Sequence, residues 1–303
     1  MVSVRALALA SVAVAALSGA ASAADLLPPP PMEAPAPFIA PDASGWYLRG
    51  DVGMGLNSLG GPSTSPSPLN GVPIGTGSDN WYNSDLSASG LFDVGVGYQV
   101  NNWFRADVTG ELRGGAEFSA LEVLNVNNGT ANGPQTGDFY RGHLSTALAM
   151  VNGYVDLGNW YGISPFVGAG VGVAFNRMSG MTDNGVVSPT GTATGAAGGV
   201  LGANTTTSLA WALMAGLDMN ITRNLKLELG YRYLNYGSFR SGPSSCMSGN
   251  GAQGSFSVAN CGGAPFTVGA RNLASNDFRV GLLYYFDAPR PAPMYEQPLV
   301  RKY

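Results

Sequence analysis

Hydrophobic and polar side chains alternate with a period of two along eight stretches of this chain. The last stretch shows the alternation most clearly, because one of its faces is apolar throughout: Phe278, Val280, Leu282, Tyr284 and Phe286. The opposite face carries Asp277 and Arg279. Successive side chains of a strand point to opposite faces, so this period predicts β-strands. The predicted strands are residues 45–56, 90–100, 103–113, 139–157, 165–176, 207–221, 225–233 and 276–286.

The connections between these strands alternate in length. Short turns follow the second, fourth and sixth strands, whereas long segments rich in Gly, Ser and Asn follow the others. We interpret these long segments, residues 57–87, 114–138, 177–206 and 235–275, as loops. An even strand count with alternating short and long connections is typical of a transmembrane barrel, and closure leaves no sheet edge in lipid. The sequence therefore predicts an all-β, eight-stranded antiparallel transmembrane up-and-down β-barrel over residues 45–286, with four long outer loops.

A soluble barrel of the lipocalin type has the same alternation with the faces inverted, so the choice depends on where the charges lie. The faces opposite the apolar ones carry a nearly balanced set of charges, which we predict to form a network inside the barrel. This set is Arg49, Asp51, Arg105, Asp107, Glu111, Arg113, Lys226, Glu228, Arg232, Asp277 and Arg279. Aromatic residues gather near strand ends on the apolar faces, as in an interfacial girdle. Eight strands enclose room only for side chains, which argues against an open pore.

One strand, residues 139–157, has an uncertain phase. Its alternate positions from Leu144 to Met150 are largely apolar, whereas the same positions from Asn152 onward are polar. A bulge that switches the two faces midway would explain this change.

The two ends of the chain lack the alternating pattern of the predicted barrel strands. Residues 1–23 contain Arg5, a short apolar run and the small-residue site Ala21-Ser22-Ala23, a pattern typical of a secretory signal peptide. Residues 24–44 and 287–303 are rich in proline, which favours extended, non-globular chain. We interpret them as a periplasmic arm and a C-terminal tail, with plain disorder as the alternative.

The composition of the chain limits the kinds of partner that we expect it to bind. Charged residues make up 11% of the chain and the net charge is −4, so nothing favours nucleic acid. Cys246 and Cys261, the two cysteines of an exported chain, predict a disulfide. With a single His elsewhere they do not complete a metal site, and we expect no cofactor and no metal. We expect a monomer that contacts outer-membrane lipid and lipopolysaccharide.

The chain resembles the small eight-stranded outer-membrane barrels of Gram-negative bacteria, in particular the alphaproteobacterial surface-antigen and hemin-binding group. The resemblance covers residues 45–286 and is carried by Gly45-Trp46-Tyr47-Leu48-Arg49-Gly50, by Pro165-Phe166-Val167-Gly168-Ala169-Gly170-Val171-Gly172 and by Phe286. A terminal aromatic in such families is similar to the signal that the barrel-assembly machinery reads, so Phe286 is a candidate for it. Seventeen residues follow Phe286 here, which departs from the usual form.

The resemblance implies a non-enzymatic role in envelope integrity and in surface or host contact through the loops. It also implies, as an alternative, heme or small-solute binding, although His143 is the only His available as a ligand. A weaker alternative is an enzyme, because the spacing of His143 and Ser145 is similar to that in outer-membrane lipid A deacylases. Those enzymes also use a Glu, and no Glu occurs between Glu122 and Glu228.

Overall fold

The structure is a computed structural model that describes residues 44–67, 77–126, 135–187, 198–247, 256–257 and 265–286. The predicted signal peptide, the C-terminal Pro-rich tail and all of the N-terminal Pro-rich arm except Ser44 lie outside the described residues. Within the described residues, no helix is long and apolar enough to cross a bilayer.

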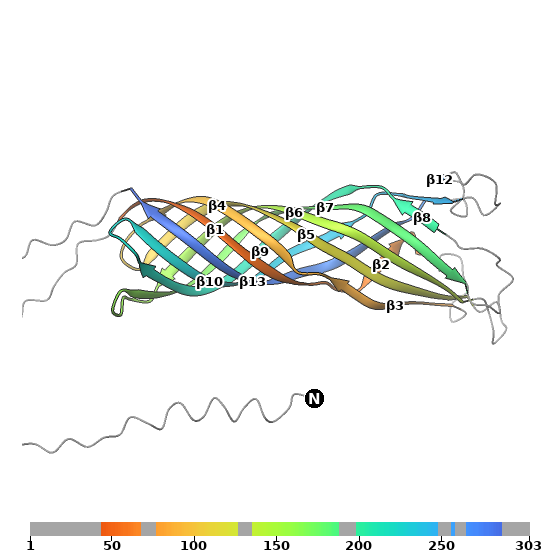
Figure 1. The fold of residues 1–303 in the computed structure, drawn as a ribbon, viewed down its shortest axis with the longest axis horizontal. Coiled ribbons are helices and arrows are strands. Elements are labelled where there is room, and N and C mark those ends of the chain that lie inside the picture. The colour runs from red at the N-terminus through yellow and green to blue at the C-terminus, as the bar shows by residue number, and fades with distance from the viewer. Residues whose placement is uncertain are drawn as a thin grey trace, which may run out of the picture. The chain divides into compact units, whose positions relative to one another are not determined.

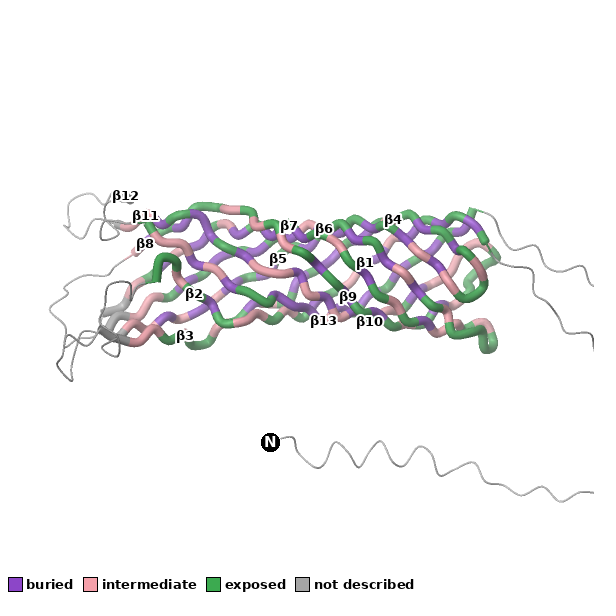
Figure 2. The backbone as a smooth tube through the Cα atoms, turned by 180° about the vertical axis from the view of Figure 1, so that it is seen from behind, coloured by how far each residue is buried: buried purple, intermediate pink, exposed green. Residues whose placement is uncertain are grey.

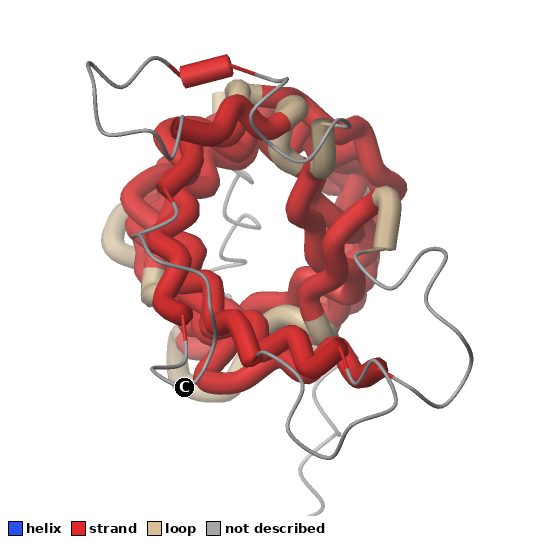
Figure 3. The backbone as a smooth tube through the Cα atoms, turned by 90° about the vertical axis from the view of Figure 1, so that its right-hand side faces the viewer, coloured by secondary structure: helices blue, strands red, loops and turns tan. Residues whose placement is uncertain are grey.

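Eight long antiparallel strands form a closed ring, as predicted (Figures 1 and 3). In order around the ring they are β1 (Gly45–Ser58), β4 (Ser89–Gln99), β5 (Phe104–Val126), β6 (Gln135–Asp156), β7 (Ile163–Val187), β9 (Asn204–Asn220), β10 (Leu225–Arg240) and β13 (Thr267–Tyr285). The β1–β13 pairing closes the ring, from Tyr47 opposite Tyr285 to Ser58 opposite Ala274. No long strand is therefore left with an unpaired edge, as a lipid environment requires.

Five short strands extend the wall at the end that carries the long connections. They are β2 (Pro62–Ser65), β3 (Gly77–Leu86), β8 (Gly198–Leu201), β11 (Ser244–Met247) and β12 (Phe256–Ser257). β2 pairs with β13, β3 with β5, and β8 with β7, while β11 and β12 continue outward from β8. We call this end of the barrel the outer end.

An apolar band covers the outside of the ring, so the faces have the orientation predicted for lipid rather than the lipocalin arrangement. Figure 2 shows buried and exposed residues alternating along each strand. On β1, Trp46, Val52 and Met54 are each 57% exposed, whereas Arg49 and Asp51 are buried. The outer limit of this band lies at Leu56, Gly90, Leu112, Ala147, Phe175, Leu209, Tyr233 and Phe278.

The prediction of four long loops was wrong in extent, because much of each segment is strand. β5 and β6 pair from Phe104–Val155 as far as Asn125–Gln135, well beyond the band limit at Leu112. Backbone N–H and C=O groups pair whatever the side chains are, so Gly-, Ser- and Asn-rich sequence can still form a sheet. The wall therefore continues beyond the band as an outer extension, and each predicted loop is shorter than its Gly/Ser/Asn-rich segment.

Bulges hide this extension from sequence periodicity. Gly115, Gly180 and Gly237 have φ values of +81°, +60° and +90°, a conformation that glycine adopts without strain. Each adjoins a shift in register, between Arg113 and Ala116 on β5, between His143 and Arg141 in the β6–β7 pairing, and on β10. On β5 the inward positions are odd-numbered up to Arg113 and even-numbered from Ala116. A bulge adds one residue, so it exchanges the two faces of its strand.

The mid-strand phase switch considered for residues 139–157 is absent. On β6, Tyr140, Leu144, Leu148, Met150 and Tyr154 all face inward. The inward side chains change from polar to apolar because the contents of the barrel change along its axis, and the strand keeps one phase.

Candidate functional site

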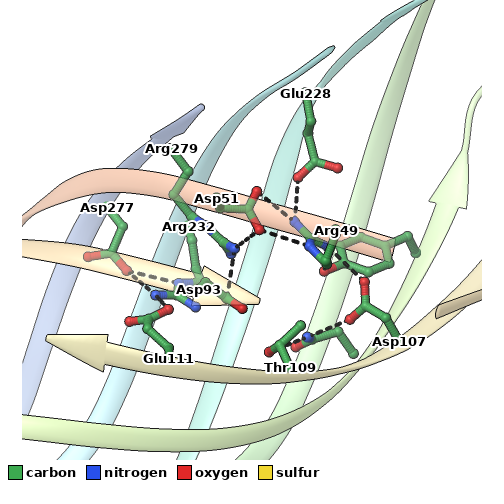
Figure 4. Close-up of polar contacts among 12 residues, drawn as sticks. Arg49, Asp51, Asp93, Asp107, Thr109, Glu111, Glu228, Arg232, Asp277 and Arg279 are labelled. Atoms are coloured by element: carbon green, nitrogen blue, oxygen red, sulfur yellow. Dashed lines mark hydrogen bonds and ion pairs between the residues drawn. The ribbon is translucent and has the colours of Figure 1, made fainter. Parts of the chain in front are cut away.

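The periplasmic-side half of the interior is filled by charged side chains, and Arg49 on β1 is at its centre (Figure 4). Arg49 donates to Asp107 on β5 at 2.7 Å and to Glu228 on β10 at 2.8 Å. It also donates to Asp51 on its own strand at 2.9 Å and to the Tyr154 hydroxyl at 2.6 Å. The Arg49, Asp51 and Asp107 side chains have no exposed surface, so one buried guanidinium is the shared ion-pair partner of three acids.

Two further layers lie toward the outer end. Arg279 bridges Asp51 and Asp93, each at 2.9 Å (Figure 4). Beyond it, Arg113 and Arg232 enclose Glu111 and Asp277. Arg232 is 2.6 Å from Glu111 and 2.7 Å from Asp277. These side chains come from β1, β4, β5, β10 and β13, so the layers tie together opposite walls of the barrel.

Arg105 fills the layer nearest the short turns. It contacts Glu228 and Asp218 at 3.2 Å each and Asp156 at 3.4 Å. Its guanidinium also lies over the rings of Tyr154 and Phe166, at 4.6 Å and 4.8 Å from their centroids.

All eleven charged residues singled out in the sequence lie on inward faces, and ten of them join these ion pairs. Lys226, the eleventh, is half-buried with its Nζ over the Tyr285 ring at 4.9 Å. The predicted network did not include Asp93, Asp156 and Asp218, which complete it. It also did not include Tyr154, or Tyr47, whose hydroxyl donates to Asp107 at 3.1 Å. The alternation of the strands contained the signal for all five, because each stands two residues from another inward position.

The interior of the outer half is apolar instead. Twenty buried residues form a single cluster there. The Phe118 and Phe239 rings meet edge to face with centroids 5.1 Å apart, and Met178 and Leu234 are fully buried beside them in the cluster. The ion-paired layers and this apolar cluster therefore follow one another along the barrel axis. We call them the polar seal and the apolar seal.

Acidic residues without basic partners gather inside the outer extension. The four carboxyl groups are Asp79 on β3, Glu122 on β5, Asp138 on β6 and Asp183 on β7, and we call them the acid cluster. Thr64 and Tyr140 donate to Glu122 at 2.6 Å and 3.0 Å. No ion pair joins these acids to a basic side chain within the described residues. The sequence segments 68–76, 127–134, 188–197, 248–255 and 258–264 contain no charged residue that could neutralise them.

All four carboxyl groups of the acid cluster have raised pKa values. Burial raises the pKa of Glu122 to about 7, and the neighbouring Asp79 adds to the increase, although the Thr64 hydrogen bond lowers it. Burial and Asp138 raise the pKa of Asp183 to about 7. Burial also raises the pKa values of Asp79 and Asp138. The cluster thus holds protons at pH values where ordinary carboxyl groups are ionised.

His143 and Ser145 lie outside the barrel rather than in its interior. Both are exposed on β6, just beyond the band limit at Ala147. Glu117 on β5 is exposed on the same surface and directly opposite His143 in the register. Glu117 was not among the predicted site residues, because its outward position depends on the bulge at Gly115. No hydrogen bond or ion pair joins these three residues in the structure's described part.

Two other predicted features lie at the ends of the wall. Phe286 is 53% exposed, and its backbone N–H donates to the Trp46 carbonyl at 3.1 Å, beside the seam that closes the ring. Its role as an assembly signal stays a prediction. Cys246 lies on β11, and Cys261 lies outside the described residues, so the disulfide also stays a prediction.

Comparison with known proteins identifies the family. The family model of the outer membrane protein beta-barrel domain matches residues 7–286. An uncharacterized protein of Brucella suis is 31% identical over 250 residues, which cover 71% of this chain and 75% of that protein. Outer membrane protein PagN of Salmonella typhimurium is 29% identical over 144 residues, covering 45% of this chain and 48% of its own.

Solved structures of other outer-membrane proteins also match this chain, at low sequence identity. Neisserial surface protein A is 14% identical with a TM-score of 0.36, and the match covers 80% of this chain and 99% of that one. The outer membrane protease OmpT of Escherichia coli is 10% identical with a TM-score of 0.39, covering 82% and 98%. The chain belongs to the outer membrane protein beta-barrel family and is a protein of the cell outer membrane.

Proposed function

We propose that this protein is a closed, non-enzymatic barrel that contributes to envelope integrity and presents its outer extension and loops for surface interaction. The filled interior carries this proposal. Ion-paired layers around Arg49 and Arg232 cross one half, and the apolar cluster around Phe118 and Phe239 crosses the other. A solute would have to displace both seals in series, so the interior argues against the small-solute alternative. The heme alternative gains no support, because the single His is exposed on the outer surface.

Planar-bilayer recording tests the closed barrel directly. We expect the purified protein to insert without giving stable conductance steps, because buried side chains fill the interior at both seals. Heat-modifiable migration in SDS gels is the control that the inserted protein is folded. Reproducible ohmic steps from a heat-modifiable preparation would contradict the proposal. A deletion strain that becomes permeable to detergent, and is restored by the wild-type gene, would support the envelope role.

A second candidate function, ester hydrolysis on an outer-leaflet lipid, has one observation in its favour. The β5–β6 register places Glu117 opposite His143, so a glutamate lies near the His143 and Ser145 pair although the sequence has no Glu between Glu122 and Glu228. Ser145 follows two residues after His143 on the same face, where a base could activate its hydroxyl. We rank this function second because no hydrogen bond or ion pair joins the three side chains, all of which belong to the described residues.

Mass spectrometry of lipid A separates the two candidates. If the barrel is non-enzymatic, cells that express it keep the same number of acyl chains as cells that express Ser145→Ala. Loss of one acyl chain with the wild-type protein, but not with Ser145→Ala or Glu117→Gln, would establish the second function. Both substitutions are on the exposed outer surface, so we expect their folding and heat-modifiable mobility to match the wild type.

A further inference from the structure

We infer that Arg141 and Arg177 bind the phosphate groups of a phosphorylated glycolipid in the outer leaflet. Both are exposed and face outward on neighbouring strands, β6 and β7. Arg177 is the next outward residue after Phe175, where the apolar band ends on β7. An arginine at this depth lies where hydrocarbon gives way to lipid headgroups.

The described arginines divide into an inward set and an exposed set. Within the described residues, the five inward arginines, Arg49, Arg105, Arg113, Arg232 and Arg279, all form ion pairs with buried acids. Arg141 and Arg177 form no ion pair with any described residue, and the same holds for the exposed Arg223, Arg240 and Arg271. Arg141 and Arg177 differ from those three because they lie on the adjacent strands β6 and β7 with Arg177 directly beyond the apolar band. In a chain with 11% charged residues, two unneutralised guanidinium groups on one face of the wall create a local positive surface.

The register gives the geometry of this arginine pair. Arg177 lies opposite Ser145, and Arg141 is four residues from Ser145 along β6. The two arginines are therefore separated by about 13 Å along the strand direction, with His143 between their levels and Ser145 beside Arg177. A disaccharide headgroup with a phosphate at each end can reach both guanidinium groups, and each can hold its phosphate with two parallel hydrogen bonds.

One negative charge borders this surface. Glu117 lies on the β5 side, opposite His143 and away from Arg177. It does not neutralise either arginine, but it would repel a second anionic group there. Charge complementarity therefore predicts that removing the Glu117 carboxylate strengthens phosphate binding, which an apolar contact with the lipid chains would not.

Native mass spectrometry of the full-length protein in detergent tests the inference, with bisphosphorylated lipid A as probe and dephosphorylated lipid A of the same acyl composition as comparison. We expect the wild type to retain the bisphosphorylated probe and to prefer it clearly over the dephosphorylated one. Each of Arg141→Gln and Arg177→Gln should weaken retention about tenfold or more, since each removes a charge-assisted contact. Glu117→Gln should strengthen it.

Two matched variants complete the design. Arg240→Gln removes an exposed arginine on β10 that already donates to Thr267 at 3.2 Å, and Arg223→Gln removes one at the periplasmic turn. Neither should change retention of the probe. Equal retention of the two lipids by the wild type, or an unchanged double variant Arg141→Gln/Arg177→Gln, would overturn the inference. If Arg240→Gln lowered retention of the bisphosphorylated probe as much as the double variant does, the binding would depend on total positive charge rather than on this pair. That result would also overturn the inference.

Discussion

Replacing Arg49 by methionine should lower the free energy of unfolding by about 3–5 kcal/mol, the usual cost of leaving buried charges without their partner. Arg49 is the common partner of Asp51, Asp107 and Glu228, and its side chain has no exposed surface. Methionine fills part of the space but leaves these carboxylates without it. Guanidinium unfolding in lipid vesicles, followed by tryptophan fluorescence and by gel mobility, measures the change.

Arg177→Met is the matched control, because it removes an arginine from an exposed position on the wall. We expect it to change stability by no more than about 0.5 kcal/mol. A double-mutant cycle of Arg49→Met with Glu228→Gln then isolates the energy of that pair. A loss in Arg49→Met no larger than in Arg177→Met would show that the interior network does not stabilise the fold.

The second large effect concerns pH and the acid cluster. Glu122 has an ordinary pKa of 4.5 and a pKa of about 7 in the folded protein. Between these values the folded state holds a proton that the unfolded state has released, so stability decreases as pH rises from about 5 to about 7 and is level above that. For Glu122 alone, this pKa shift corresponds to a decrease of roughly 3 kcal/mol in the free energy of unfolding over that pH range. We therefore expect the outer extension to be more stable at pH 5 than at pH 8.

Hydrogen exchange in β3 and in the outer parts of β5 and β6 measures this stability locally. Exchange there, corrected for the intrinsic rate, should be faster at pH 8 than at pH 5 in the wild type. Glu122→Gln keeps the site neutral at both pH values, so it should remove much of the difference and protect the segment at pH 8. Glu117→Gln, on the exposed face of the same strand, is the control and should leave the pH dependence unchanged. Protection that does not vary with pH in the wild type would contradict the expected titration.

The sequence predicted the part of the barrel that lies in lipid. There, every outward residue of a strand such as β1 has the same apolar neighbour, so alternation from Trp46 to Leu56 reports the faces directly. The inward charges, from Arg49 to Arg279, follow from the same alternation, because an unpaired charge cannot point into hydrocarbon.

The outer extension could not be predicted in the same way, for two physical reasons. Beyond the band both sides of the wall tolerate polar residues, and the interior becomes apolar, so the contrast between the faces is lost or inverted. Bulges at Gly115, Gly180 and Gly237 then exchange the faces within a strand. Without the bulge at Gly115, Glu117 would point inward, and no reading of β5 alone would place it beside His143.

The outer extension also sets how far from the membrane the loops stand. On β5 it continues from Leu112 to Val126, which for a strand tilted by about 40° corresponds to roughly 35 Å above the apolar band. Backbone pairing and the internal apolar cluster hold the outer extension together, so it acts as a stiff spacer rather than a flexible tether. It holds the outer ends of β5 and β6 at a fixed height above the apolar band, which residue insertions in the connecting segments would leave unchanged.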